Sequence, residues 1–425
     1  MEEAKYVSRI LLPMLMHYRV SSEHVCSGSG ARDATAQLVE QFAYEYGETY
    51  DAYLATESDR EYFVDSAERG AVAYHRRGRH LIVGGSLLAP PEACDSLLAE
   101  FIAHAHERQL QVSFVNVPRS QTKLFRRHGL QITKWGEEPI ICLQETTWQG
   151  KEFGWVRRQE NFCSRQGATF EEVVPDVDDP TYRDRIVPEL LAVSDAHIGA
   201  TLHRRELPVF EGRFCPLHMQ RRRLFVARRA GRIEAFVVCN PGMGGDFWAI
   251  EIYRRLPDAV RGVIPFLIMK ILRRLKEEGA CYASLSLVPF VRCETAVRGD
   301  SGCLRVGANF WWKHLNVIFD MQGIYHFKSR FRPHYRELYV AAKPGLTLRS
   351  SISLALAWKV LSFNPLRLLR RMLFQWGARR RTLAKPDWRP ERLIHKLRPA
   401  DAPHANAAGS AAEAETANDA MLLAE

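Results

Sequence analysis

Strand-like and helix-like patterns follow one another in a similar order in both halves of this chain, and this order limits the folds that the chain can adopt. In the first half, residues 45–145, the apolar runs Ala71–Tyr74 and Leu81–Val83 flank a glycine-containing turn. Apolar residues at helical spacing follow in Ser96–Arg108, and Val112–Val115 has the pattern of another strand. These patterns predict an α+β unit of roughly 100 residues.

The second half repeats this theme, although no residue-level identity between the halves is visible. Leu224–Ala227 and Glu234–Val238 predict paired strands, and Trp248–Tyr253 predicts a further strand. Ile264–Glu278 predicts a helix, and Ala283–Ser286 predicts the strand after it. A strand pair, a strand, a helix and a strand is the order of acyltransferase domains of the GNAT kind. We therefore expect an α+β fold with two tandem GNAT-like domains.

The positive charge of the chain is concentrated near its C-terminus. The formal net charge is +10, and residues 343–398 alone hold 14 Lys and Arg against two acids. Leu366, Leu369, Leu373 and Trp376 recur at helical spacing, with arginines on the other faces. A basic amphipathic helix of this kind can lie on an anionic membrane surface. Alternatively, its apolar stripe docks on the protein's own body.

The cysteine pattern and the hydropathy of the chain exclude several classes of protein. Nine cysteines are scattered without a CxxC pair, which predicts neither a disulfide framework nor a thiolate zinc site. No run approaches the roughly 20 apolar residues of a spanning helix, and no secretory cleavage pattern follows the N-terminus. No zinc spacing, phosphate-binding loop or dinucleotide turn occurs. We expect an intracellular protein with no metal and no cofactor.

One block in the second half combines charged residues, proline and glycine at short spacings. It holds Glu251, Arg254, Pro257-Asp258-Ala259 and Gly262, which precedes the predicted helix. Further blocks are Gly136-Glu137-Glu138, Gly150-Lys151, Val156-Arg157, Asn161, Ser194-Asp195, Glu206, Phe210–Phe214 and Phe327–Tyr335. Together these blocks resemble the synthase region of the phosphatidylglycerol lysyltransferases, over roughly residues 50–342.

Among the departures of the chain from that family's pattern, two lie in the second half and one concerns the extent of the chain. Glu251 stands where the family usually has Asp. The strand Ser284–Phe290 reads Ser-Leu-Ser-Leu-Val-Pro-Phe in place of Asn-Leu-Gly-Met-Ala-Pro-Leu. The chain also lacks the membrane-spanning flippase half of the long family members, so we expect it to make a lipid without moving it across the bilayer.

The resemblance implies transfer of an aminoacyl group from an aminoacyl-tRNA to a hydroxyl on a lipid headgroup, usually that of phosphatidylglycerol. The implied partners are the aminoacyl-tRNA as donor and an anionic membrane lipid as acceptor and surface. The expected location is the cytoplasm, with peripheral attachment to the inner face of the membrane. Exchange of one ester for another is nearly isoenergetic, so no metal or nucleotide is needed to drive it.

Such a transfer needs a carboxylate to accept a proton and cations to stabilise developing negative charge. The candidate catalytic residues are Glu251, Arg254 and Asp258, and the candidate substrate-binding residues are Lys328, Arg330, Arg157, Glu137, Asp195 and Glu206. Side chains alternate along a strand, so positions 251 and 254 point to opposite faces unless the strand bulges between them. Lys328 and Arg330 suit phosphate and share a face if extended.

Each group of candidates also has a structural interpretation. Glu251 and Arg254 can form a plain surface ion pair. Asp258 can cap a helix or hold Arg254 in place, and Ser194-Asp195 can be a helix N-cap. Lys328 and Arg330 can be solvated charges. The histidines near Ser194-Asp195 are more often surface groups than bases.

The predicted parts of the chain follow from these patterns. They are an N-terminal extension (1–44), a first GNAT-like domain (45–165), a second, catalytic GNAT-like domain (166–342), a basic amphipathic helical segment (343–398) and a disordered Ala-rich tail (399–425). The tail has no aromatic residue and little apolar surface to bury, which is typical of disorder.

Two other functions remain open from the sequence. One is an acyl-CoA-dependent N-acyltransferase, the usual chemistry of GNAT-like domains, although no glycine-rich pyrophosphate turn precedes the helix in either half. The other is a non-catalytic module that binds tRNA or a membrane.

Overall fold

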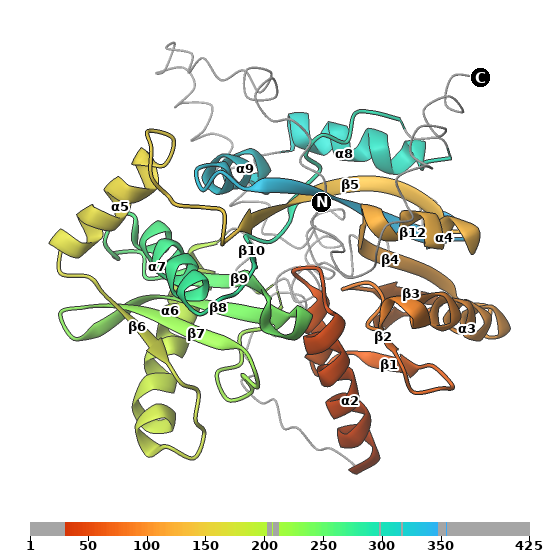
Figure 1. Ribbon diagram of the computed structural model, residues 1–425, viewed down its shortest axis with the longest axis horizontal. Coiled ribbons are helices and arrows are strands. Elements are labelled where there is room, and N and C mark those ends of the chain that lie inside the picture. Colours follow the sequence, from red (N-terminus) through yellow and green to blue (C-terminus); the bar gives the residue numbers. More distant parts are fainter. Residues whose placement is uncertain are drawn as a thin grey trace, which may run out of the picture. The chain divides into compact units, whose positions relative to one another are not determined.

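The computed structural model describes residues 30–201, 206, 212–296, 299–315, 318–346 and 354 (Figure 1). The predicted tail and nearly all of the predicted basic segment 343–398 lie outside the described residues. None of the helices in the described part of the chain is long and apolar enough to cross a membrane.

The protein is built on one mixed sheet with helices on its faces (Figure 1). Its strands are β1 Glu61–Val64, β2 Ala71–Arg77, β3 His80–Val83, β4 Gln111–Pro118, β5 Gln131–Cys142, β6 Thr169–Val173, β7 Arg223–Arg229, β8 Arg232–Gly242, β9 Phe247–Arg255, β10 Tyr282–Ser284, β11 Val288–Pro289 and β12 His334–Lys343. Its α-helices are α2 Gly30–Tyr46, α3 Cys94–Glu107, α4 Thr122–Arg127, α5 Gly154–Arg165, α6 Val187–Ala200, α7 Val263–Glu277, α8 Gly302–His314 and α9 Met321–Ser329. The mixed α+β class and the strands and helices predicted in both halves are confirmed.

The two halves share an order of strand pairing. In the first, β1, β2 and β3 pair antiparallel, and β3 then pairs parallel with β4 after the crossover helix α3. In the second, β6 to β9 pair antiparallel in sequence, and β9 pairs parallel with β10 after α7. Each half is therefore an antiparallel run that ends in one parallel pair.

The last strand, β12, crosses from the second half of the sequence into the sheet of the first. It pairs antiparallel with β4 on one side and with β5 on the other. Strand β10 pairs antiparallel with β5, which joins the two halves into one sheet. The predicted range 166–342 thus includes a strand that completes the first half.

Helix α2 contains the described part of the predicted N-terminal extension. Val39, Phe42 and Ala43 are buried against the first half. The Tyr44 hydroxyl donates a hydrogen bond to the carbonyl of Gly244 in the second half, at 2.7 Å. This helix therefore contacts both halves.

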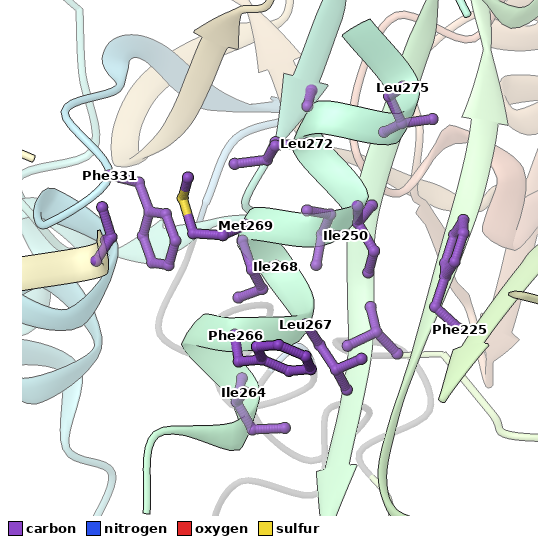
Figure 2. Packing of buried hydrophobic residues seen from close by; sticks show 14 of the residues in the cluster. Phe225, Ile250, Ile264, Phe266, Leu267, Ile268, Met269, Leu272, Leu275 and Phe331 are labelled. Atoms are coloured by element: carbon purple, nitrogen blue, oxygen red, sulfur yellow. The ribbon is translucent and has the colours of Figure 1, made fainter. Parts of the chain in front are cut away.

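Helix α7 organises the core of the second half (Figure 2). It begins after Gly262, whose φ of 88° suits glycine, and its apolar residues recur at helical spacing. Phe266 and Leu272 are buried against the sheet, where Phe225 and Ile250 face them. Full burial of a side chain of this kind contributes roughly 1.5–3 kcal/mol. Helix α6 covers the opposite face of the same strands.

Candidate active site

A cavity lies where the parallel strands β9 and β10 separate. The two strands pair over Phe247–Ala249 and Tyr282–Ser284, where β10 ends while β9 continues to Arg255. The cavity has a volume of about 160 Å³. It is lined by Tyr50, His197, Ile198, Thr201, Glu206, Glu251, Ile252, Tyr253, Arg254, Ser286, Leu287, Pro289, Phe319, Ile324 and Lys328. Four candidates from the sequence, namely Glu206, Glu251, Arg254 and Lys328, line this one cavity.

A β-bulge explains how Glu251 and Arg254 reach the same cavity. Ile250 pairs with Cys239 and Ile252 pairs with Val238, so Glu251 is the extra residue on β9. A bulge sets two residues against one partner and shifts the alternation of side chains. The bulge that allows the side chains of Glu251 and Arg254 to face the same cavity is therefore present.

Glu251 is a buried carboxyl group with one unsatisfied oxygen. Its side chain accepts a hydrogen bond from the Asn240 amide through Oε2. Oε1 has no hydrogen-bond partner among the described residues. Burial raises the pKa of Glu251 well above its usual value, and the positive charge of Arg222 opposes this rise. The negative charge of Glu57 adds to it. A raised pKa suits a group that takes up a proton near neutral pH.

Gly212 lies against this carboxyl group and leaves no room for a side chain. Its φ is +68°, and a Cβ built on it would lie 2.7 Å from Cδ2 of Leu54 and 3.0 Å from Oε1 of Glu251. Only glycine meets both demands without strain. This gives a physical reason for the glycine in the block Phe210–Phe214, whose residues 210 and 211 lie outside the described residues.

Arg254 is buried and held by an acid other than Glu251. Its Nη2 lies 2.6 Å from Oε1 of Glu206, and its Nη1 donates to the Ser194 hydroxyl. The guanidinium also lies over the ring of Phe214, at 5.5 Å from the centroid. The interpretation of Glu251 and Arg254 as a plain surface ion pair is therefore wrong, because both are buried and Arg254 pairs with Glu206.

Lys328 and Arg330 point to different surroundings. Lys328 is 4% exposed, and its Nζ donates to the carbonyl oxygens of Ser286 and Leu287, at 3.1 and 3.0 Å. The solvated interpretation is thus wrong for Lys328. Arg330 follows the end of α9, donates to His326 and lies outside the cavity. Lys328 and Arg330 would share a face only in an extended segment. This segment is instead the end of α9, where side chains two positions apart point in different directions.

Asp258 lies on the surface, away from the cavity. Its side chain is 65% exposed and pairs with Arg232 at 2.7 Å, and this hydrogen bond lowers the pKa of Asp258. The capping residue of α7 is Gly262, which makes no side-chain capping bond. Asp258 therefore neither caps that helix nor lines the cavity with Arg254.

Arg157 and Glu137 also lie outside the cavity lining. Arg157 donates a hydrogen bond to the carbonyl of Trp148 at 2.8 Å. Glu137 is buried on β5 between two cations, at 2.7 Å from Lys134 and 3.1 Å from Arg292. Burial raises the pKa of Glu137, while both cations lower it.

The pair Ser194-Asp195 lies inside α6, not at its start. The N-terminal capping position of α6 is Ile186, so the N-cap interpretation of the pair is wrong. Successive residues of a helix point in different directions. Ser194 is therefore buried and accepts a hydrogen bond from Arg254, while Asp195 is exposed.

Sequence reasoning missed several residues of the cavity. Tyr50 comes from the first half, and no local pattern marks it. Ser286 lies in the strand block that departs from the family pattern, and its hydroxyl donates to the carbonyl of Ile250 at 2.8 Å. His197, interpreted as a surface group, lines the cavity. Its pKa is lowered by burial and by Arg254, which keeps the imidazole neutral at pH 7.

The arrangement combines a proton acceptor with fixed positive charge in a partly enclosed space. A buried carboxyl, a buried guanidinium and a buried ammonium suit a reaction in which a hydroxyl loses a proton and an oxyanion develops. In the described part of the chain, no group of three or more His, Cys, Asp or Glu side chains is placed to hold a metal ion.

Comparison with known proteins identifies related sequences. The family model described as phosphatidylglycerol lysyltransferase, C-terminal, matches residues 40–342. The phosphatidylglycerol lysyltransferase of Bacillus subtilis (strain 168) is 24% identical over 324 residues, which are 74% of this chain and 36% of that protein. That of Staphylococcus aureus (strain MSSA476) is 23% identical over 321 residues, with the same two shares. The chain thus spans little more than a third of the length of these curated relatives.

Two solved structures share the fold. One is the C-terminal domain of a protein assigned as a lysylphosphatidylglycerol synthetase from Agrobacterium fabrum, with a TM-score of 0.64, 22% identity, and coverage of 77% of this chain and 96% of that one. The other is L-PGS from Bacillus licheniformis, with a TM-score of 0.62, 22% identity, and coverage of 76% and 94%. The resemblance predicted from the blocks is confirmed, and the chain belongs to the family of the phosphatidylglycerol lysyltransferase C-terminal region.

Proposed function

We propose that this chain transfers an aminoacyl group from an aminoacyl-tRNA to a hydroxyl of a phosphatidylglycerol headgroup. The observation that carries the proposal is the buried carboxyl of Glu251, which lines the cavity together with Arg254 and Lys328 and has one oxygen without a hydrogen-bond partner among the described residues. The names of the relatives support phosphatidylglycerol as acceptor and lysine as the transferred residue. The donor is proposed because its ester is already activated, so no further energy source is needed.

In the proposed step, the acceptor hydroxyl attacks the carbonyl carbon of the aminoacyl ester and gives its proton to Glu251. The bond from that carbon to the ribose oxygen of the tRNA then breaks, and the ribose oxygen takes up the proton. One ester replaces another, so the step consumes no further reactant. The positive charges of Arg254 and Lys328 stabilise the oxyanion and the headgroup phosphate.

We further propose that the two halves are tandem GNAT-like units, 45–165 and 166–342, and that the second carries the reaction. The shared order of strand pairing supports this assignment. The first unit contributes Tyr50 to the cavity wall. The proposed boundary divides the sequence but not the sheet, because β12 belongs to the second unit by sequence and pairs with strands of the first unit.

The donor tRNA is proposed to contact cations near the start of α5. Arg330 lies over the ring of Trp155, at 5.8 Å from the centroid, and Arg157 is two residues further along the same helix. These side chains can contact phosphates outside the cavity while the aminoacyl end enters it.

The test is transfer by the purified chain from radiolabelled lysyl-tRNA to vesicles that contain phosphatidylglycerol, with product lipid measured after extraction. The proposal predicts labelled lipid that depends on both substrates. A parallel assay with alanyl-tRNA examines the choice of amino acid. Absence of labelled lipid with either donor, combined with acyl transfer from an acyl-CoA to an amine, would instead establish the N-acyltransferase.

The pH dependence of the reaction should report the raised pKa of Glu251. The carboxylate form accepts the proton, so kcat/KM should fall as the pH drops through this pKa, at higher pH than for an exposed glutamate (about 4.3). Asn240→Leu removes a hydrogen bond that lowers the pKa of Glu251, so the fall in kcat/KM should occur at higher pH in this variant. If the fall occurs at the same pH in this variant, it reports the titration of another group.

Peripheral attachment to the inner membrane face is proposed to involve residues 343–398, with their 14 basic residues. Deletion of this segment should weaken binding to vesicles of anionic lipid, because each base near such a surface contributes about 1 kcal/mol. Sedimentation with vesicles measures the effect. Undiminished sedimentation after the deletion would refute the anchoring role.

A further inference from the structure

Helix α8 carries apolar side chains on the face that points away from the protein. Val306 is 63% exposed and Phe310 is 54% exposed, one helical turn apart. Cys303, a turn before them, is also exposed. Of the residues described in α8, Ala308 alone is buried. A helix on the surface of a protein normally shows a polar face to water, so exposed apolar side chains one turn apart on that face are unusual.

The same face becomes basic toward the end of the helix. Lys313 and His314 are exposed in the last turn, and α8 contains no Asp or Glu. Arg305 is half-buried and paired with Asp300 at 2.9 Å. An exposed apolar stripe with adjacent cations is typical of a helix that lies in the headgroup region of an anionic membrane.

Helix α8 is joined to the wall of the cavity. The Gln322 side chain of α9 donates a hydrogen bond to the carbonyl of Trp312 in α8, at 2.9 Å. The rings of Trp312 and Tyr325 are also in contact, with centroids 6.3 Å apart. Two other residues of α9, Ile324 and Lys328, line the cavity. A membrane surface in contact with α8 therefore lies next to α9, the helix that forms one wall of the cavity.

The small size of the cavity fits such a surface when the substrate is the proposed lipid. Its volume of about 160 Å³ is below the roughly 300–1,000 Å³ of pockets that enclose a drug-sized ligand. A polar headgroup fits more readily than acyl chains do. The chains of a diacyl lipid must therefore stay outside, and the bilayer that contains them has to lie close to the cavity.

We propose that the outer face of α8, formed by Cys303, Val306, Phe310, Lys313 and His314, inserts into the interface of an anionic lipid bilayer and orients the cavity toward the headgroups. The inference rests on the proposed function for its lipid substrate. Of the other exposed large apolar residues in the described part of the chain, Val174, Val177 and Leu217 belong to loops, and Phe162 and Leu191 lie singly on α5 and α6.

The first test measures partitioning of the full chain onto vesicles, without tRNA. The vesicles are phosphatidylcholine with phosphatidylglycerol, or phosphatidylcholine alone. Val306→Ser combined with Phe310→Ser should lower the partition coefficient on the anionic vesicles by about tenfold, because two apolar side chains no longer leave water. The matched control, Val174→Ser with Leu217→Ser, changes residues of similar exposure and should leave partitioning unchanged. Equal partitioning of all three proteins would overturn the proposal.

The second test locates α8 directly and does not depend on a change in affinity. A polarity-sensitive fluorophore is attached to Cys303, with Cys26, Cys142, Cys215 and Cys281 replaced by serine. Its emission should shift to the blue when anionic vesicles are added, whereas a label on Leu217→Cys should not respond. A label that stays in water on vesicle-bound protein would refute insertion. If α8 instead packs on another part of the chain, the label reports an apolar site before vesicles are added, which also refutes it.

The outcomes separate this inference from the proposed transfer reaction. Activity of the α8 double variant is compared on vesicles and on a short-chain phosphatidylglycerol dissolved as monomers. A loss on vesicles with normal activity on monomers supports the docking role. If wild-type protein transfers to neither acceptor, the proposed function fails, yet the partitioning and fluorescence results still decide whether α8 binds the membrane.

Discussion

Glu251→Gln should lower kcat/KM for aminoacyl transfer by about 10²–10⁴-fold, the usual contribution of a general base. Glutamine keeps the shape of the side chain and a hydrogen bond with Asn240, but it cannot accept the proton of the acceptor hydroxyl. The loss should appear mainly in kcat, because proton transfer belongs to the transition state. Steady-state transfer assays with varied lipid concentration measure both constants.

The same variant should be at least as stable as the wild type. Since the folded-state pKa of Glu251 is raised, ionisation of this group lowers stability as the pH rises through that pKa. Glutamine does not ionise, so the difference in unfolding temperature should grow in favour of the variant with increasing pH. Asp258→Asn is the matched control, because this exposed carboxylate lies outside the cavity and its loss should change activity by less than about twofold. Equal activity of Glu251→Gln and wild type would end the general-base proposal.

Arg254→Gln should lower kcat by about 10²–10³-fold, which is the range for removal of one donor that stabilises an oxyanion. The variant also removes the ion-pair partner of Glu206, whose carboxylate is 25% exposed and keeps a hydrogen bond from the backbone N–H of Phe214. Arg254→Lys retains the charge but cannot contact both Glu206 and Ser194 with the planar guanidinium geometry, so we expect an intermediate loss.

A double-mutant cycle separates positioning from direct contact with substrate. Glu206→Gln should reduce kcat less than Arg254→Gln, because Glu206 acts by holding the guanidinium. Once Arg254 is glutamine, the second change should have little further effect, as expected for residues in one network. Additive losses would show that Glu206 acts separately from Arg254. Thermal unfolding of each variant checks that the loss does not arise from unfolding.

The regular elements were predictable because they depend on local physics. The apolar runs Leu224–Ala227 and Glu234–Val238 can bury their side chains as strands, and the apolar residues at helical spacing in Ile264–Glu278 can bury theirs as a helix. The blocks of charged residues and glycine were also sufficient to predict the family. Several members of the candidate site followed from the same blocks.

Local patterns in the amino-acid sequence were enough to predict the two α+β halves, the family and the residue types available for the reaction. Which of these residues come together in one cavity depends on the tertiary structure. The bulge at Glu251 depends on its pairing with β8, and Lys328 enters the cavity while Arg330 does not because α9 is a helix there. Tyr50 reaches the same cavity from the other half. These arrangements depend on contacts between residues that are far apart in the sequence. The energies of such contacts are set by packing and burial, so they leave no local pattern in the sequence.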